Sequence, residues 1–187
     1  MLLVFQVNCP GCFSYALPFF NQLNKEFNNQ GISFLALSTA FEDFNKNTLE
    51  NTKALVEKGT LIGETQKMML QQGEYHLPYS IDFPIGMDLL KDNLDDAELK
   101  KAANDICMTN ANYNSWSNTD KQTILKRVEI YLKSLDKIAL TFTLNQLKGT
   151  PSLLLFNNKY DVLKEWFGHV PYEQIASELT NFINKKP

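Results

Sequence analysis

Hydrophobic residues in the first part of the chain occur as a run, then at helical spacing, then as a run again. The run at 2–7 is too short for a helix and predicts a buried strand. Over residues 12–27 apolar side chains recur every three or four positions, which predicts a helix that Pro18 kinks and Gly31 ends. The second run, at 32–37, predicts another buried strand. Strand, helix and strand form a βαβ unit, so we expect parallel strands joined by a right-handed crossover.

Similar patterns extend through the rest of the chain. They predict a helix at 48–58, a second helix or an extension of the first at about 61–72, a strand at 83–87, helices at about 95–107 and 119–138, strands at 152–156 and 161–167, and a closing helix at 172–183. Asp88 should end the strand before it, and Asn157-Asn158 should form a hairpin turn. We therefore expect one domain spanning 1–187, with a polar helical insertion at about 92–140 before the helix that leads to Pro151.

The composition is that of an ordinary globular protein, with 44% hydrophobic, 12% aromatic and 21% charged residues. These values exclude a disordered or collagen-like chain. With 18 basic and 21 acidic side chains the net charge is −3, which argues against a nucleic-acid binder and against polybasic membrane attachment. No apolar run approaches the roughly 18 residues of a membrane-spanning helix, and the first residues do not resemble a signal peptide. We therefore expect a cytoplasmic protein, or a periplasmic one if a longer precursor loses a signal sequence.

Two of the three cysteines, Cys9 and Cys12, fall between the first predicted strand and the first predicted helix. Free N–H groups and the positive end of the helix dipole stabilise a thiolate at that place. Because Pro10 has no N–H group, the amides of Gly11 and Cys12 are the expected donors to the Cys9 sulfur. We expect Cys9 to be the exposed nucleophile, with a pKa of about 6 to 7.5 instead of about 8.5, and Cys12 to be the buried resolving thiol. The two-residue spacing allows a reversible disulfide without backbone movement.

Other uses of a C-x-x-C pair find less support in the sequence. The pair could be half of a zinc site, but the remaining candidate ligands, Cys107, His76 and His169, are scattered along the chain. Inert cysteines are a further alternative, and redox chemistry is the preferred interpretation. We expect Cys107 to be a small buried hydrophobic residue on a helix, with a third redox partner as the alternative. The sequence predicts no metal site and no cofactor.

Thr150-Pro151 is the second informative site, because it follows a predicted helix and directly precedes an apolar strand. A proline there is consistent with a cis bond that turns an unpaired backbone edge toward a substrate, and the alternative is a simple proline at a strand entry. Combined with a C-x-x-C pair upstream, the cis bond is the preferred interpretation. We expect this peptide to lie within contact distance of the Cys9 sulfur.

These features together resemble a known family. Residues 5–12, Thr150-Pro151 and Phe167-Gly168 before the last helix resemble the thioredoxin superfamily, nearest to its TlpA-like and redoxin branch. The segments that resemble this branch are 83–88, similar to its FPVGVD strand, 148–152, similar to its GTP cis-proline loop, and 39–42, similar to the loop after the second strand in redoxins with a CPGC centre. The resemblance covers roughly 2–60, 78–90 and 140–185.

The resemblance implies an α/β thioredoxin-like fold, in which helices flank a central mixed sheet of four or five strands. It implies thiol-disulfide exchange by Cys9 and Cys12, and substrate binding by Pro10, Gly11, Thr150 and Pro151. The sequence departs from the family pattern at Asn8, where an aromatic residue is common, and at Leu3, which replaces a buried aspartate. The pair also lacks the central histidine of strongly oxidising centres, and no P-x-x-x-[ST]-x-x-C motif precedes either cysteine.

The leading functional hypothesis is a thiol-disulfide oxidoreductase that reduces protein or small-molecule disulfides with electrons from a thiol or dithiol donor. One alternative is a peroxiredoxin-like peroxide reductase acting through Cys9, against which the missing motif argues. The other is a non-enzymatic thioredoxin-fold binding module whose partner site is the helical insertion. There Trp116, Tyr113 and Met108 would either form an apolar surface for a partner or pack the insertion internally.

Overall fold

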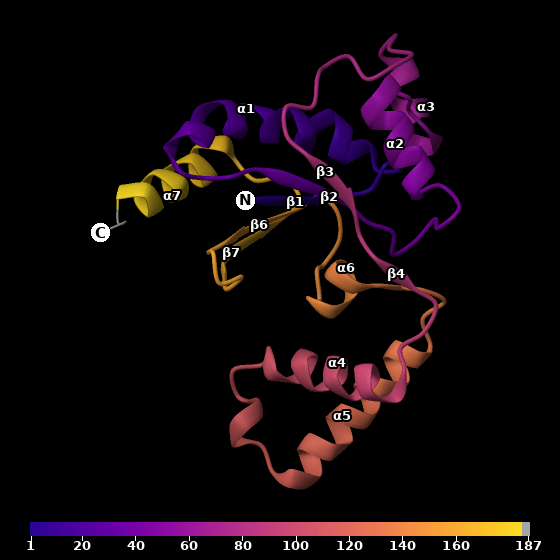
Figure 1. Cartoon of the computed structure of the whole chain (residues 1–187), viewed down its shortest axis with the longest axis vertical. Helices are drawn as coiled ribbons and strands as arrows, with labels where there is room; N and C mark the ends of the chain where they lie inside the picture. Colours follow the sequence, from indigo (N-terminus) through magenta and orange to yellow (C-terminus); the bar gives the residue numbers. More distant parts are fainter. Residues whose placement is uncertain (185–187) are drawn as a thin grey trace. The chain divides into compact units, whose positions relative to one another are not determined.

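A computed structural model of the protein describes residues 1–184 (Figure 1). The chain divides into two compact units. Residues 1–87 and the chain from Lys148 onward form the first unit, and Asp88–Leu147 form the second. The second unit includes the expected helical insertion at about 92–140. That the whole chain is a single domain stays a prediction.

The first unit contains a five-stranded mixed sheet. Its strands are β1 (Leu2–Phe5), β2 (Leu35–Ser38), β3 (Ile85–Met87), β6 (Ser152–Phe156) and β7 (Val162–Phe167), in the spatial order β3-β2-β1-β6-β7. β1, β2 and β3 are parallel, whereas β6 is antiparallel to β1 and β7 is antiparallel to β6. All residues of the central β1 are buried, as its unbroken apolar run predicts. The sheet confirms the mixed arrangement expected from the sequence.

The helix after the cysteines differs from the prediction of one continuous helix at 12–27. Residues Cys12–Ala16 form a π-helical turn, and α1 (Leu17–Phe27) continues from it. The N–H group of Leu17 donates to the carbonyl of Cys12, five residues back. Pro18 follows directly and has no N–H group to donate into this turn. The carbonyl of Phe13 accepts instead from the Tyr79 hydroxyl at 2.6 Å. Pro18 therefore coincides with a change from π to α hydrogen bonding.

The other helices of the first unit match their predicted positions closely. A short 3-10 turn (Asn28–Gln30) follows α1, and Gly31 ends it with a φ of 81°. α2 (Leu49–Lys58) is capped by Thr48, whose hydroxyl accepts from the Asn51 N–H group at 3.1 Å. α3 (Gly63–Gln71) is a separate helix rather than an extension of α2. α7 (Tyr172–Asn184) closes the described part of the chain.

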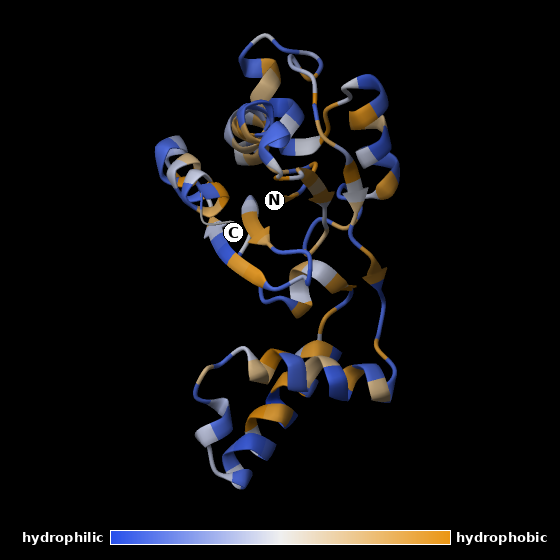
Figure 2. Ribbon diagram, turned by 60° about the vertical axis from the view of Figure 1, so that its left-hand side comes forward, coloured by the Kyte–Doolittle hydropathy of each residue, from blue (hydrophilic) through white to orange (hydrophobic). Residues whose placement is uncertain are grey.

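A hydrophobic core joins the sheet of the first unit to its helices. Figure 2 shows the strands largely in the colour of hydrophobic residues, whereas the helices carry both hydrophobic and hydrophilic positions. The large side chains that are almost fully enclosed include Leu3 and Phe5 of β1, Phe20 of α1, Leu153 of β6 and Ile175 of α7. This core holds β1 in place together with the start of the cysteine helix, by which we mean the π-helical turn Cys12–Ala16 and α1.

The second unit is helical apart from one short pair of strands. Its elements are β4 (Leu90–Lys91), α4 (Asp96–Met108), a 3-10 turn (Tyr113–Ser115), α5 (Asn118–Lys133), β5 (Ile138–Ala139) and α6 (Leu140–Leu144). α4 and α5 pack together through Leu99, Ala102, Ile106 and Leu132. The prediction of a helix to residue 138 was wrong at its end, because residues 138 and 139 pair with β4. The pairing partner lies far away in the sequence, so helical periodicity could not reveal it.

Candidate active site

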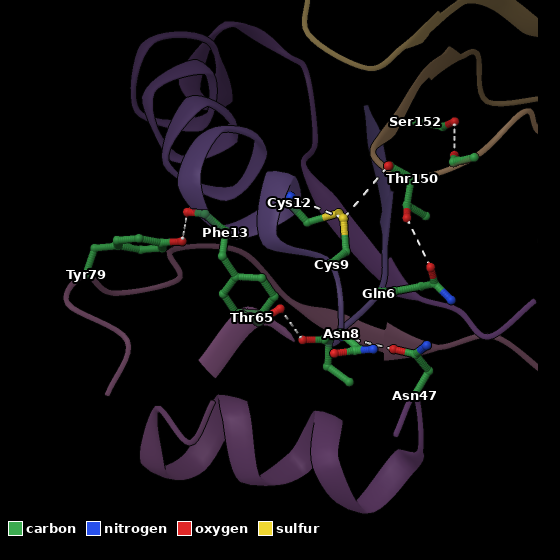
Figure 3. Close-up of a disulfide and its surroundings, with 12 residues drawn as sticks. Gln6, Asn8, Cys9, Cys12, Phe13, Asn47, Thr65, Tyr79, Thr150 and Ser152 are labelled. Atoms are coloured by element: carbon green, nitrogen blue, oxygen red, sulfur yellow. Dashed lines mark hydrogen bonds between the residues drawn. A yellow bond between two sulfur atoms is a disulfide. The ribbon is translucent and has the colours of Figure 1, made fainter. Parts of the chain in front are cut away.

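Cys9 and Cys12 form a disulfide between β1 and the helix that follows it (Figure 3). Their Cα atoms are 5.3 Å apart. Cys9 is half-buried, whereas Cys12 has no exposed surface. The structure thus confirms the expected difference in exposure between the two cysteines.

The first turn of the helix places a backbone N–H donor beside the Cys9 sulfur. The N–H group of Cys12 lies 3.0 Å from the carbonyl oxygen of Cys9 and 3.2 Å from its Sγ. It is one of the two amides expected from the sequence. Pro10, which is half-buried, and Gly11, which is exposed, lie between the two cysteines at the start of this turn. An amide and a helix start beside Cys9 favour negative charge on its sulfur once the disulfide is reduced.

The peptide bond between Thr150 and Pro151 is cis, as predicted. The carbonyl oxygen of Thr150 lies 3.8 Å from the Cys9 Sγ, which confirms the predicted proximity (Figure 3). The carbonyl of Pro151 accepts from the N–H group of Gly168 at 2.9 Å. Residues from the segments 9–12, 150–151 and 167–168, which the sequence singled out, therefore meet at one place. Substrate binding by Pro10, Gly11, Thr150 and Pro151 stays a prediction.

Gln6 is a site residue that the sequence analysis missed. Its side chain is buried in the turn between β1 and the cysteines, and its Oε1 accepts from the Thr150 hydroxyl at 3.2 Å (Figure 3). Its amide nitrogen lies 3.5 Å from the carbonyl of Glu42. Gln6 thus links the Thr150 loop to the loop after β2. A polar residue in the otherwise apolar run 2–7 was the available signal.

A second missed group surrounds the residue before Cys9. The N–H group of Asn8 donates to the Asn47 side-chain oxygen at 3.0 Å, and the Thr65 hydroxyl donates to the carbonyl of Val7 at 2.9 Å (Figure 3). Asn47 and Thr65 are buried. Neither residue type nor spacing distinguished them in the sequence, because their role comes from contacts between distant segments.

Tyr15 connects the turn after Cys12 to the loop before α7. Its hydroxyl donates to the carbonyl of Val170 and accepts from the Val170 N–H group, which lies 3.1 Å away. Its ring stacks on the exposed imidazole of His169, with 4.0 Å between centroids. Burial raises the pKa of Tyr15, so the phenol remains a neutral donor near pH 7.

The third cysteine lies in the second unit. Cys107 is a buried residue of α4, as expected, and burial raises the pKa of its thiol. Tyr113 is also buried and packs edge to face against Trp116, with 5.7 Å between ring centroids, whereas Met108 is exposed. Of the two alternatives for these residues, internal packing of the insertion holds for Tyr113, whereas Met108 is on the surface. Among residues 1–184, no three His, Cys, Asp or Glu side chains gather as a metal-binding group.

Comparisons with known proteins bear on the fold. No protein-family model and no curated protein matches the chain. Among solved structures, a thioredoxin-like superfamily protein shares 19% identity, covers 99% of this chain and 79% of its own, and has a TM-score of 0.56. A thiol-disulfide isomerase from Corynebacterium glutamicum shares 17% identity, covers 99% of this chain and 80% of its own, and has a TM-score of 0.55. The chain therefore has an α/β thioredoxin-like fold, in which helices flank a mixed five-stranded sheet and a C-x-x-C disulfide follows β1.

Proposed function

We propose that the protein is a thiol-disulfide oxidoreductase of the TlpA-like and redoxin kind, which reduces protein or small-molecule disulfides through Cys9 and Cys12. The observation that carries this proposal is the Cys9–Cys12 disulfide, in which the half-buried Cys9 places its Sγ 3.8 Å from the Thr150 carbonyl oxygen. The fold shared with a thiol-disulfide isomerase supports it. Within residues 1–184 no helix is both long and apolar enough to cross a membrane.

In the reduced protein, the Cys9 thiolate attacks one sulfur of a substrate disulfide. A bond forms between Cys9 and the substrate, the substrate's own S–S bond breaks, and the second substrate sulfur leaves as a thiolate that takes a proton. Cys12 then loses its proton and attacks the Cys9 sulfur, which releases the first substrate thiol. Two electrons have passed to the substrate, and the Cys9–Cys12 disulfide remains. A thiol or dithiol donor returns it to the dithiol.

The surroundings of the disulfide suit these steps. The Cys12 amide stabilises the attacking and leaving thiolate of Cys9, since it lies 3.2 Å from that sulfur. A substrate joined to Cys9 would lie against Pro10 and Gly11 on one side and Thr150 and Pro151 on the other. In a reducing cytoplasm the net direction is substrate reduction, because the donor pool keeps the pair as a dithiol.

Reduction of insulin by dithiothreitol tests the proposal. We expect the protein to accelerate insulin precipitation, and Cys9→Ser to abolish the effect. Cys12→Ser should retain the first step and accumulate a mixed disulfide, because no second thiol resolves it. Cys107→Ser is the matched control and should keep full activity, since Cys107 is a free cysteine buried on α4 and forms no part of the Cys9–Cys12 pair. Peroxide consumption without insulin reduction would contradict the proposal.

A further inference from the structure

Residues 6–8, between β1 and the cysteines, belong to neither a strand nor a helix. Side chains from other segments of the first unit hold each of them. The contacts are Thr150 Oγ1 to Gln6 Oε1 at 3.2 Å, Thr65 Oγ1 to the Val7 carbonyl at 2.9 Å, and the Asn8 N–H group to Asn47 Oδ1 at 3.0 Å. Residues 6–8 lack the repeating backbone hydrogen bonds of a strand or helix, and these side-chain contacts hold them directly before Cys9.

Asn8 makes two further contacts through its side chain. Its Nδ2 donates to Asp43 Oδ2 at 2.6 Å, and its Oδ1 accepts from the Glu64 N–H group at 2.7 Å. The amide is thus held on one side by the loop after β2 and on the other by the first turn of α3. Of the three residues in the turn, Asn8 is the one that adjoins Cys9.

The contact with α3 satisfies a helix end. The first N–H groups of a helix have no acceptor within the helix, and the Ile62 side chain at the N-cap position has no polar atom to supply one. Asn8, 56 residues away in the sequence, supplies the acceptor for Glu64. Gly63 allows this approach, since it has a φ of +55° and a Cβ there would lie 2.1 Å from Asn8 Oδ1. A glycine at position 63 is therefore needed for the contact between Asn8 and α3.

Backbone hydrogen bonds also hold the turn that carries Asp43, the other contact of the Asn8 side chain. The carbonyl of Asp43 accepts from the N–H groups of Lys46 at 2.8 Å and Asn47 at 2.9 Å. The buried Asn47 also donates to the carbonyl of Glu42 at 3.0 Å. These bonds restrict the turn that carries the Asp43 carboxylate. Asn8 is consequently held between two segments whose backbones are themselves fixed by hydrogen bonds, the turn at 43–47 and the start of α3.

We propose that Asn8 is a positioning residue for Cys9, and that its clamp between Asp43 and the start of α3 sets the place of the Cys9 sulfur relative to Cys12. The inference rests on the proposed function, because the position of Cys9 matters for exchange between thiols and disulfides. Loss of these contacts leaves the reactivity of the Cys9 thiolate unchanged. It lets the sulfur move away from the position needed to attack a substrate disulfide and to form the disulfide with Cys12.

The test compares Asn8→Ala with Asn21→Ala. Asn21 is a matched control on α1, since its side chain donates to the Ser80 carbonyl at 2.6 Å and accepts from the Asp82 N–H group at 3.0 Å. The reduced proteins react with a small aromatic disulfide over a range of pH, and the plateau rate at high pH isolates geometry from the pKa of Cys9. We expect Asn8→Ala to lower the plateau rate about tenfold and Asn21→Ala to stay within about twofold of the natural protein.

A swapped pair of substitutions provides the rescue. Asn8→Asp together with Asp43→Asn exchanges donor and acceptor, so the new carboxylate accepts both from the Glu64 N–H group and from the new amide. The plateau rate of the double variant should return to within about threefold of the natural protein. A natural rate in Asn8→Ala, an equal loss in Asn21→Ala, or a double variant as slow as Asn8→Ala would overturn the inference.

A second measurement separates this inference from the proposed function. The equilibrium between the Cys9–Cys12 disulfide and glutathione depends on how well the two sulfurs are placed, and it requires no turnover. The constant measured is the one for forming the Cys9–Cys12 disulfide from the dithiol and glutathione disulfide. We expect Asn8→Ala to lower this constant about tenfold and Asn21→Ala to leave it unchanged. A natural protein that reduces no disulfide refutes the proposed function alone, while an unchanged constant in Asn8→Ala refutes the positioning role alone.

Discussion

Cys9 and Cys12 are separated by two residues, yet their surroundings differ. Cys9 is half-buried and faces the N–H group of Cys12, whereas Cys12 is completely enclosed. Cys107 is buried on α4, and burial raises the pKa of its thiol. At the scale of single residues, exposure and one backbone amide therefore distinguish the three cysteines, in the order that their places in the sequence predicted.

Alkylation of the reduced protein with iodoacetamide checks this ordering. We expect Cys9 to react first, with a rate that rises at lower pH than for an ordinary cysteine, because the thiolate is the reactive form and the Cys12 amide stabilises it. Cys107 should react much more slowly than Cys9, since its raised pKa and its burial both limit the exposed thiolate near pH 7. Mass spectrometry of the labelled peptides identifies the site. Labelling of Cys12 before Cys9 would contradict the assignment of the nucleophile.

At the scale of elements, the cysteine helix depends on a contact from outside itself. The π-helical turn at Cys12–Ala16 and the missing N–H group of Pro18 leave the Phe13 carbonyl to the Tyr79 hydroxyl. Burial raises the pKa of Tyr79, so the hydroxyl keeps its proton through the neutral range. The loop between α3 and β3 thereby stabilises the first turns after the disulfide.

Removing that hydroxyl measures its contribution. Tyr79→Phe leaves the Phe13 carbonyl without this donor, and we expect a loss of about 1 to 3 kcal/mol in the free energy of unfolding. Urea denaturation of the oxidised protein gives the value. Tyr75→Phe is the matched control, because Tyr75 lies in the same loop with 74% of its surface exposed. Equal stabilities of the two variants would show that the hydroxyl contributes nothing to the helix.

At the scale of the whole molecule, the chain leaves the first unit at Asp88 and returns to it at Lys148. The first unit builds its core from its own residues. Within the second unit, β4 and β5 pair Leu90 with Ala139, and Asp92 forms an ion pair with Lys137 at 2.6 Å. The two ends of the α4 and α5 segment therefore lie next to each other.

This geometry allows a deletion that keeps both strands. Replacing residues 93–136 with Asn-Gly would close β4 and β5 as a two-residue hairpin. We expect cooperative unfolding, Cys9 alkylation and insulin reduction to persist, because the core of the first unit remains complete. If the helices select substrates, reduction of the natural partner alone should fall. Circular dichroism during heating checks the fold, and loss of a cooperative transition would show that the helices are structurally required.

The sequence by itself determined the features that depend on neighbouring residues. Hydrophobic runs predicted β1 and β6, helical spacing and Thr48 predicted α2, and Gly31 predicted the end of the cysteine helix. The C-x-x-C pair after a strand predicted the greater exposure of Cys9, and the resemblance implied the mixed sheet. Apart from the mixed sheet, each of these follows from a local pattern, because side-chain period and turn preference act over a few residues.

The tertiary structure decided what depends on contacts between distant segments. Residues 138 and 139, predicted as the end of a helix, pair with β4 instead, and Tyr79 completes the turn after Cys12 from 66 residues away. Asn47 and Thr65 reach the residues before Cys9 across 39 and 58 positions. Asparagine, threonine and tyrosine have many roles on a protein surface, so their identity alone does not indicate a site. Their role at this disulfide arises because folding buries their polar groups where one particular partner satisfies them.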